Sequence, residues 1–336
     1  MRPGVAFPHR HPHEATHVGP LLSRLEDVAV TPAGEAAVVV HADTRPPVDG
    51  AWNVQVFHGM GDKGYVTNAI FLQKGRWPKL RTALNMGLSA FWLPAPFLRP
   101  PARPGKKPSR YQQVNAFGPR WGDWFSDMLT DVEVSRFGHV ALNEMEGIAP
   151  DPEGPIVWMP TWNNRRYLGG ANQSSLPRFA TEVARMAQSG LPFIVKYHPL
   201  TVRRGQARVA RRLLEGIPNV TVAPPDIEPY SLLQGARAVL TDTSSLGFEA
   251  YAMGFPVAVV RPPGVRHKGL HEELAQRVPV FEIGRPGIDD WARDPEPPSD
   301  SAWARDLLDA PRRKLNDKFA ANLRQKVVEW TSGARW

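Results

Sequence analysis

The sequence predicts an α/β fold made of two doubly wound domains, each with a parallel sheet, and a cleft between them. At 336 residues the chain exceeds what one hydrophobic core usually holds. From residue 36 onward, short β-branched runs alternate with helical patterns, which is typical of parallel sheets covered by helices. A stretch at 147–154, punctuated by Pro150, Pro152 and Gly154, divides this alternation and predicts the domain boundary.

The first domain is predicted at 36–150, with strands at 36–41, 54–58 and 112–117. The second is predicted at 151–315, with strands at 156–160, 193–198, 220–223, 238–241 and 257–260, and helices at 176–189, 205–215, 228–235 and 246–253. These βα units suffice for one doubly wound domain. Within 316–336, apolar residues at helical spacing predict an amphipathic helix over 316–331 that packs on the first domain. Residues 1–35 are expected to be disordered or irregular.

Composition narrows the function classes. The chain has no cysteine, which excludes disulfides, thiolate metal sites and a cysteine nucleophile. Its net charge of +8 predicts an anionic partner. No apolar run has the length of a signal peptide core or a membrane span, so we expect a cytoplasmic protein that is neither secreted by that route nor integral to a membrane.

One basic segment departs from the average composition. Between Asp62 and Asp123 there is no acidic residue, whereas Lys and Arg are frequent and aromatic residues are interleaved with them. Such a stretch is typical of an element that lies on an anionic membrane surface, and we place this element at 74–110. A solvated loop beside a polyanionic substrate or RNA explains the composition equally well.

His58 is the first candidate for chemistry, because it ends the predicted strand 54–58, where open α/β sheets bind ligands. Its imidazole titrates near neutrality, so His58 suits a general base that takes a proton from an attacking hydroxyl. Lys63 follows it and would hold a phosphate. A structural role is the alternative for a histidine at the end of a strand.

Lys196 and His198 end the predicted strand 193–198. Strand alternation places both side chains on one face, where they can contact the same anion. The alternative is a surface histidine beside a solvated lysine. Arg165 and Arg166 follow the strand 156–160 and suit phosphate binding, although solvated arginines in a loop are an equal alternative.

A run of hydroxyl residues, Thr243, Ser244 and Ser245, follows Asp242 at the start of the predicted helix 246–253. Free N–H groups at a helix N-terminus, together with three hydroxyls, favour a phosphate site. Glu249 lies one turn into the helix, where it can reach ribose hydroxyls. Ordinary helix capping is the alternative. We expect no metal site and no cofactor; the histidines near the N-terminus are expected to be disordered.

Taken in order, five motifs resemble the family of CDP-glycerol glycerophosphotransferases, which build teichoic-acid-like polymers. The resemblance covers roughly 54–260, which is most of the chain. Its motifs are His58-Gly59 with Lys63, Phe117-Gly118-Pro119-Arg120 with Asp123, Pro160-Thr161-Trp162, Lys196-Tyr197-His198-Pro199, and Thr241 to Ser245 with Phe248, Glu249 and Pro256. The sequence differs from the usual family pattern at Thr243, Glu249 and Asn163, where the family has Tyr, Asp and Arg.

The resemblance implies a GT-B fold with Rossmann-like domains, in which the second domain binds the nucleotide donor. It implies transfer of glycerol phosphate, or a related polyol phosphate, from CDP-glycerol to a hydroxyl of a membrane-linked or polymeric acceptor, with release of CMP. The protein would be peripheral at the inner face of the membrane. His58 would be the general base, His198 would contact the donor pyrophosphate, and residues 243–245 would hold the phosphates.

Three other functions stay open. A GT-B glycosyltransferase would use a nucleotide sugar for a cell-surface polysaccharide. A nucleotide-sugar 2-epimerase shares the architecture, but the sequence offers few carboxylates beyond Asp242 and Glu249 for its chemistry. A non-catalytic protein would use the basic segment to bind RNA or an anionic membrane, although we expect no nucleic acid partner.

Overall fold

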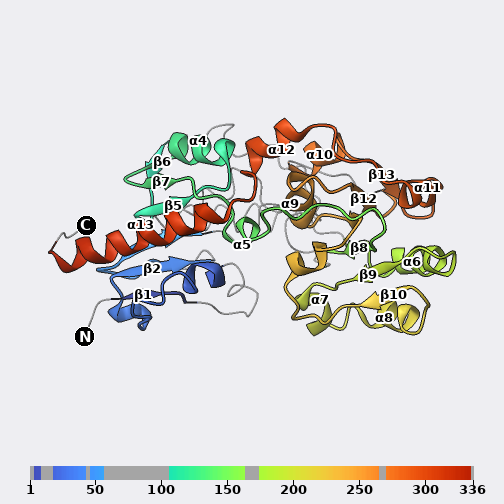
Figure 1. Ribbon diagram of the computed structural model, residues 1–336, viewed down its shortest axis with the longest axis horizontal. Helices are drawn as coiled ribbons and strands as arrows, with labels where there is room; N and C mark the ends of the chain where they lie inside the picture. Colours follow the sequence, from blue (N-terminus) through green and yellow to red (C-terminus); the bar gives the residue numbers. More distant parts are fainter. Residues whose placement is uncertain are drawn as a thin grey trace, which may run out of the picture.

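The computed structural model describes residues 4–8, 18–42, 46–56, 106–162, 174–264 and 270–333. These residues form two α/β domains that lie side by side (Figure 1). The first domain contains the N-terminal strands together with the last helix of the chain. The second domain contains the strands from residue 156 onward.

The first domain has a parallel sheet of five strands, which follow one another in chain order: β1 (Val5–Ala6), β2 (Val38–His41), β3 (Trp52–Gln55), β5 (Gln113–Asn115) and β7 (Glu133–Ser135). The β2 strand is fully buried, which explains why three consecutive valines precede its last residue, His41. A separate small sheet pairs β4 (Lys107–Pro108) with β6 (Leu129–Thr130). The 3₁₀ helix η1 (Ala33–Glu35) precedes β2.

The N-terminal segment is more ordered than its composition predicts. Val5 and Ala6 form β1, which pairs in parallel with Val38 and Val39 of β2. Val5 packs into the first-domain core beside Leu21 and Leu25. The expectation of disorder or irregularity over 1–35 therefore does not hold at Val5–Ala6, which form a strand, or at Ala33–Glu35, which form a 3₁₀ helix. Proline and histidine are frequent in this segment, but Val5, Leu21 and Leu25 are buried and tie its described parts to the core of the first domain.

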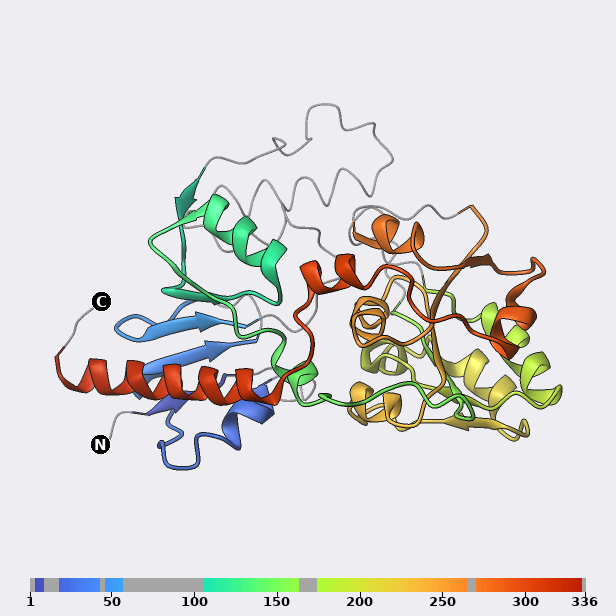
Figure 2. The same cartoon turned by 45° about the horizontal axis from the view of Figure 1, so that its top comes forward.

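The last helix, α13 (Arg313–Thr331), returns to the first domain. Phe319, Leu323 and Val327 lie in one core cluster with Val38 and Val54 of the sheet. Figures 1 and 2 both show α13 running along the first domain, far from the strands that precede it in the chain. The helix spans three residues more at its N-terminus than the predicted 316–331. Two shorter helices of the domain are α4 (Pro119–Met128) and α5 (Val140–Asn143).

The second domain has a six-stranded parallel sheet with the order β10-β9-β8-β11-β12-β13. Its strands are β8 (Ile156–Met159), β9 (Phe193–Val195), β10 (Val220–Val222), β11 (Ala238–Thr241), β12 (Val257–Arg261) and β13 (Val280–Glu282). Its helices are α6 (Phe179–Gln188), α7 (Pro199–Arg203), α8 (Arg208–Leu214), η3 (Pro229–Leu233), α9 (Leu246–Ala252), α10 (Leu270–Ala275), α11 (Ile288–Arg293) and α12 (Ser301–Leu307). Among the described residues, no helix is both long and apolar enough to cross a membrane.

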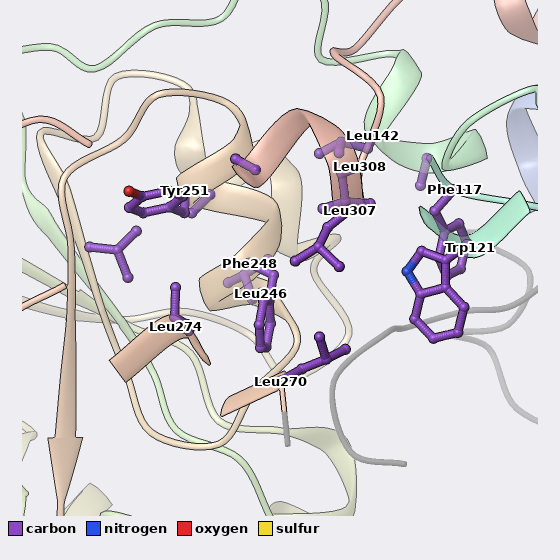
Figure 3. Packing of buried hydrophobic residues seen from close by; sticks show 14 of the residues in the cluster. Phe117, Trp121, Leu142, Leu246, Phe248, Tyr251, Leu270, Leu274, Leu307 and Leu308 are labelled. Atoms are coloured by element: carbon purple, nitrogen blue, oxygen red, sulfur yellow. The ribbon is translucent and has the colours of Figure 1, made fainter. Parts of the chain in front are cut away.

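A shared hydrophobic core joins the two domains through α12, which contacts both α4 and α9. Figure 3 shows Phe117 and Trp121 of the first domain near Leu307, with Phe248 and Tyr251 on the other side. The backbone of α12 approaches Gly118 so closely that a Cβ atom there would lie 2.6 Å from the Leu307 oxygen. Glycine at this position is therefore required by the contact between the domains.

Candidate active site

The carboxyl ends of β8, β9 and β11 bring three of the predicted motifs to one edge of the second sheet. Strand order reverses at β8, because β9 lies on one side of it and β11 on the other. In open α/β sheets, ligands bind outside the strand ends at such a switch point. Thr161 follows β8, His198 follows β9 and Thr243 follows β11, so the candidate site lies where the fold predicts it.

Asp242 organises this edge. One of its carboxylate oxygens accepts hydrogen bonds from the backbone N–H groups of Thr161 (2.8 Å) and Thr243 (2.7 Å). The other accepts from the backbone N–H of Ser175 (2.7 Å) and from its hydroxyl (3.0 Å). Burial raises the pKa of Asp242 to about 6, and these hydrogen bonds act in the opposite direction. The carboxylate thus fixes two loops against each other and is not available to a ligand.

The hydroxyl run is only partly used in capping α9. Ser244 accepts a long hydrogen bond of 3.4 Å from the Leu246 N–H, and the Ser245 side chain hydrogen-bonds Glu249. The Thr243 hydroxyl is buried and has no hydrogen-bond partner in the part of the chain that the structure describes. The N-cap residue of α9 is Ser245, and Thr243 takes no part in capping, so its hydroxyl can hydrogen-bond a ligand at the switch point.

Lys196 and His198 both lie beyond the end of β9 at Val195, so strand alternation does not set their directions. The buried Lys196 ammonium lies 3.4 Å from the Pro225 carbonyl oxygen. The carboxylates of Asp226 and Glu228 attract its positive charge. Burial lowers the pKa of Lys196, while these two carboxylates oppose that change. Its charge is therefore partly balanced within the protein.

His198 begins α7, and its Nδ1 accepts a hydrogen bond of 3.2 Å from the Leu200 N–H. An Nδ1 that accepts leaves the proton of the neutral imidazole on Nε2. His198 therefore offers an N–H donor, which suits an anionic ligand better than proton removal does. The centroid of its ring lies 6.4 Å from that of Trp162. The guanidinium of Arg204 lies over the same Trp162 ring, 4.7 Å from its centroid.

A buried polar cluster crosses from one domain to the other. Glu249 of α9 accepts a hydrogen bond of 2.9 Å from the Tyr230 hydroxyl. Nε2 of His139, which begins α5 in the first domain, lies 3.9 Å from the other Glu249 carboxylate oxygen. Burial raises the pKa of Glu249 to about 7. Sequence reasoning missed His139; its position four residues after β7, near the carboxyl edge of the first sheet, is the signal that could have found it.

Comparison with known proteins shows which fold this architecture belongs to. The sequence matches no family model and no curated protein. Among solved structures, the wall teichoic acid polymerase TagF superposes with a TM-score of 0.63, at 11% identity over 98% of this chain and 90% of TagF. A histidine variant gives 0.65 at 10% identity over the same shares. TagF soaked with CDPG gives 0.62 at 9% identity, covering 98% and 89%. The fold is GT-B.

Within the GT-B fold, several predicted site residues fall outside the described part of the chain. They are His58, Lys63, Arg165 and Arg166. The same holds for residues 74–105 of the predicted membrane-facing segment, for Asn163, and for the histidines at 9–17. Their predicted roles remain predictions. The described part of the site consists of Thr161, His198 and the hydroxyl run at 243–245, organised by Asp242.

Proposed function

We propose that this chain is a transferase that moves glycerol phosphate, or a related polyol phosphate, from a CDP-activated donor to a hydroxyl of a membrane-linked or polymeric acceptor. The likeness to TagF over nearly the whole chain supports the proposal at the level of the fold. The observation that carries it is the switch point, where the Thr243 hydroxyl and the Nε2 donor of His198 flank the end of β8. Both groups donate hydrogen bonds, as a pyrophosphate requires.

In the proposed reaction, the acceptor oxygen attacks the β-phosphorus of the donor, and the bond between this phosphorus and the CMP oxygen breaks. His58 takes the proton of the acceptor hydroxyl as general base. His198, Thr243 and Ser244 hold the phosphates, and Lys63 with Lys196 adds positive charge. Orientation and charge stabilisation provide most of the acceleration, because phosphoryl transfer needs little covalent chemistry from the protein.

Arg165 and Arg166 belong to the same proposal as further phosphate contacts, and Glu249 as a contact of the ribose. The protein would work in the cytoplasm, peripheral to the inner face of the membrane, where residues 74–110 would meet anionic lipid. This placement gives the enzyme access to a lipid-linked acceptor without a membrane span of its own. No metal and no cofactor take part in the proposed reaction.

Transfer of a sugar from a nucleotide sugar is the second candidate. The sequence differs from the resembled family at three positions that would contact the donor, and these differences favour sugar transfer. The positions are Thr243, Asn163 and Glu249. A site that holds phosphate through hydroxyls and N–H groups accepts other nucleotide donors as well. The two functions differ in the bond that is broken and in the nucleotide that is released, CMP or a nucleoside diphosphate.

A donor panel tests the proposal. Each ligand is added separately at about a hundred times its own dissociation constant; the ligands are CDP-glycerol, CDP-ribitol, UDP-sugars and CMP. At that concentration a ligand that binds only the folded state stabilises it by about 2.7 kcal/mol. For a chain of 336 residues this corresponds to a rise in Tm of roughly 4 °C. We expect the cytidine ligands to produce it. A shift with UDP-sugars alone would favour glycosyl transfer, and salt-sensitive RNA binding without any donor shift would contradict both candidates.

Two histidine variants then separate binding from chemistry. We expect His58→Ala to keep the thermal shift with CDP-glycerol and to slow CMP release with acceptor by at least about a hundredfold, the usual contribution of a general base. His198→Ala should reduce the thermal shift as well, because it removes a donor to the pyrophosphate. If His58→Ala releases CMP at the wild-type rate, His58 is not the general base.

A further inference from the structure

Helix α8 presents a surface that the proposed active site does not use. Ala210 and Leu214 are fully buried and pack in the core of the second domain, with α6 as the neighbouring helix. On the opposite side, Arg208 and Arg212 lie one turn apart and are exposed. Beside them, Val209 is 64% exposed and Leu213 is 40% exposed. One ridge of arginines therefore runs next to one ridge of aliphatic side chains.

The charge of this surface is mostly uncompensated. Residues 203–215 contain five arginines and a single acidic residue, Glu215. Arg211 pairs with Glu215 at 2.7 Å, and Arg204 lies over the Trp162 ring at 4.7 Å. Arg203, Arg208 and Arg212 are exposed and form no ion pair with any residue that the structure describes. Cations without partners on one face attract a dense anionic surface.

We propose that this α8 face, formed by Arg208, Val209, Arg212 and Leu213, docks on an anionic lipid bilayer. Arginines would meet the headgroup phosphates, and the two aliphatic side chains would enter the boundary between headgroups and acyl chains. A nucleic acid would neutralise the arginines but would leave Val209 and Leu213 in contact with water. Figure 1 shows α8 at the edge of the second domain beside β10.

Vesicle flotation of the full chain tests this docking surface. The vesicles are phosphatidylcholine alone or phosphatidylcholine with about a third phosphatidylglycerol, which makes the surface negative. Near such a surface each arginine contributes about 1 kcal/mol of binding free energy, which is about fivefold in partitioning. We expect binding to the anionic vesicles only, and a loss of about 25-fold for Arg208→Gln with Arg212→Gln. The matched control is Lys314→Gln with Lys318→Gln, two exposed cations one turn apart on α13, which should change partitioning little.

The aliphatic pair separates lipid from other polyanions. Val209→Ser with Leu213→Ser keeps the charge and should lower vesicle partitioning by at least about fivefold, because two side chains no longer leave water. The same variant should bind a single-stranded RNA oligonucleotide like the wild type. If it binds vesicles like the wild type, or if the arginine variant loses no more than the lysine control, the proposal is wrong. The assay contains neither donor nor acceptor, so its result is independent of the proposed reaction.

Discussion

The buried carboxyl of Glu249 should make the stability of the protein depend on pH in a way that one substitution removes. Its pKa is raised from 4.5 to about 7, mainly by burial. The folded protein therefore keeps this proton at pH values where the unfolded chain has lost it. The resulting stability is fully present below about pH 4.5 and is lost as the pH rises through 7. Integrated between pH 5 and pH 8, the loss is about 2.5 kcal/mol.

Glu249→Gln keeps the size of the side chain and an oxygen that can accept from the Tyr230 hydroxyl, but it cannot ionise. We expect Tm of the variant, measured relative to the wild type by thermal denaturation, to increase by roughly 3–4 °C from pH 5 to pH 8. Glu272→Gln, at an exposed position of α10, is the control and should show no such trend. A constant difference between Glu249→Gln and the wild type across this range would refute a buried carboxyl that titrates near neutrality.

Two further substitutions test the packing described above, both by urea unfolding. Gly118→Ala should reduce the free energy of unfolding by about 1–3 kcal/mol, because the new Cβ would overlap the Leu307 backbone. The control is Gly34→Ala, which should be nearly neutral because nothing lies within 4 Å of the new Cβ. Equal effects of the two substitutions would contradict the close approach at Gly118. Ser175→Ala removes the hydroxyl bond to Asp242 and the acceptor of the buried Trp158 Nε1–H group, so it should cost about 1–3 kcal/mol. An unchanged midpoint would mean that this hydroxyl does not help to fix the loop.

The second domain could be predicted closely from its sequence. Predicted strands at 156–160, 238–241 and 257–260 correspond to β8, β11 and β12, each within one residue at either end. Buried parallel strands are covered on both faces, so they are continuous β-branched runs that stand out from their surroundings. Strand β13 was missed because Val280, Phe281 and Glu282 are only partly buried and form no such run.

Which residues lie at the site could be predicted in part, but which of them contact one another could not. Residues at strand ends were identified because the fold class fixes which end of a sheet binds ligands. The role of Asp242 depends on Thr161, which is 81 residues away in the chain and becomes its neighbour only because β8 pairs with β11. The contact between His139 and Glu249 likewise requires the two domains to meet. Local patterns carry no information on either pairing.

The motif Phe117-Gly118-Pro119-Arg120 shows why a shared motif need not mark chemistry. Gly118 admits the backbone of Leu307, and Arg120 forms ion pairs with Asp306 at 2.6 Å and with Glu273 at 2.9 Å. Both partners belong to helices of the second domain, α12 and α10. The motif thus serves the junction between the domains. Since His139 reaches Glu249 across the same junction, its packing also sets how residues of the first domain meet the second.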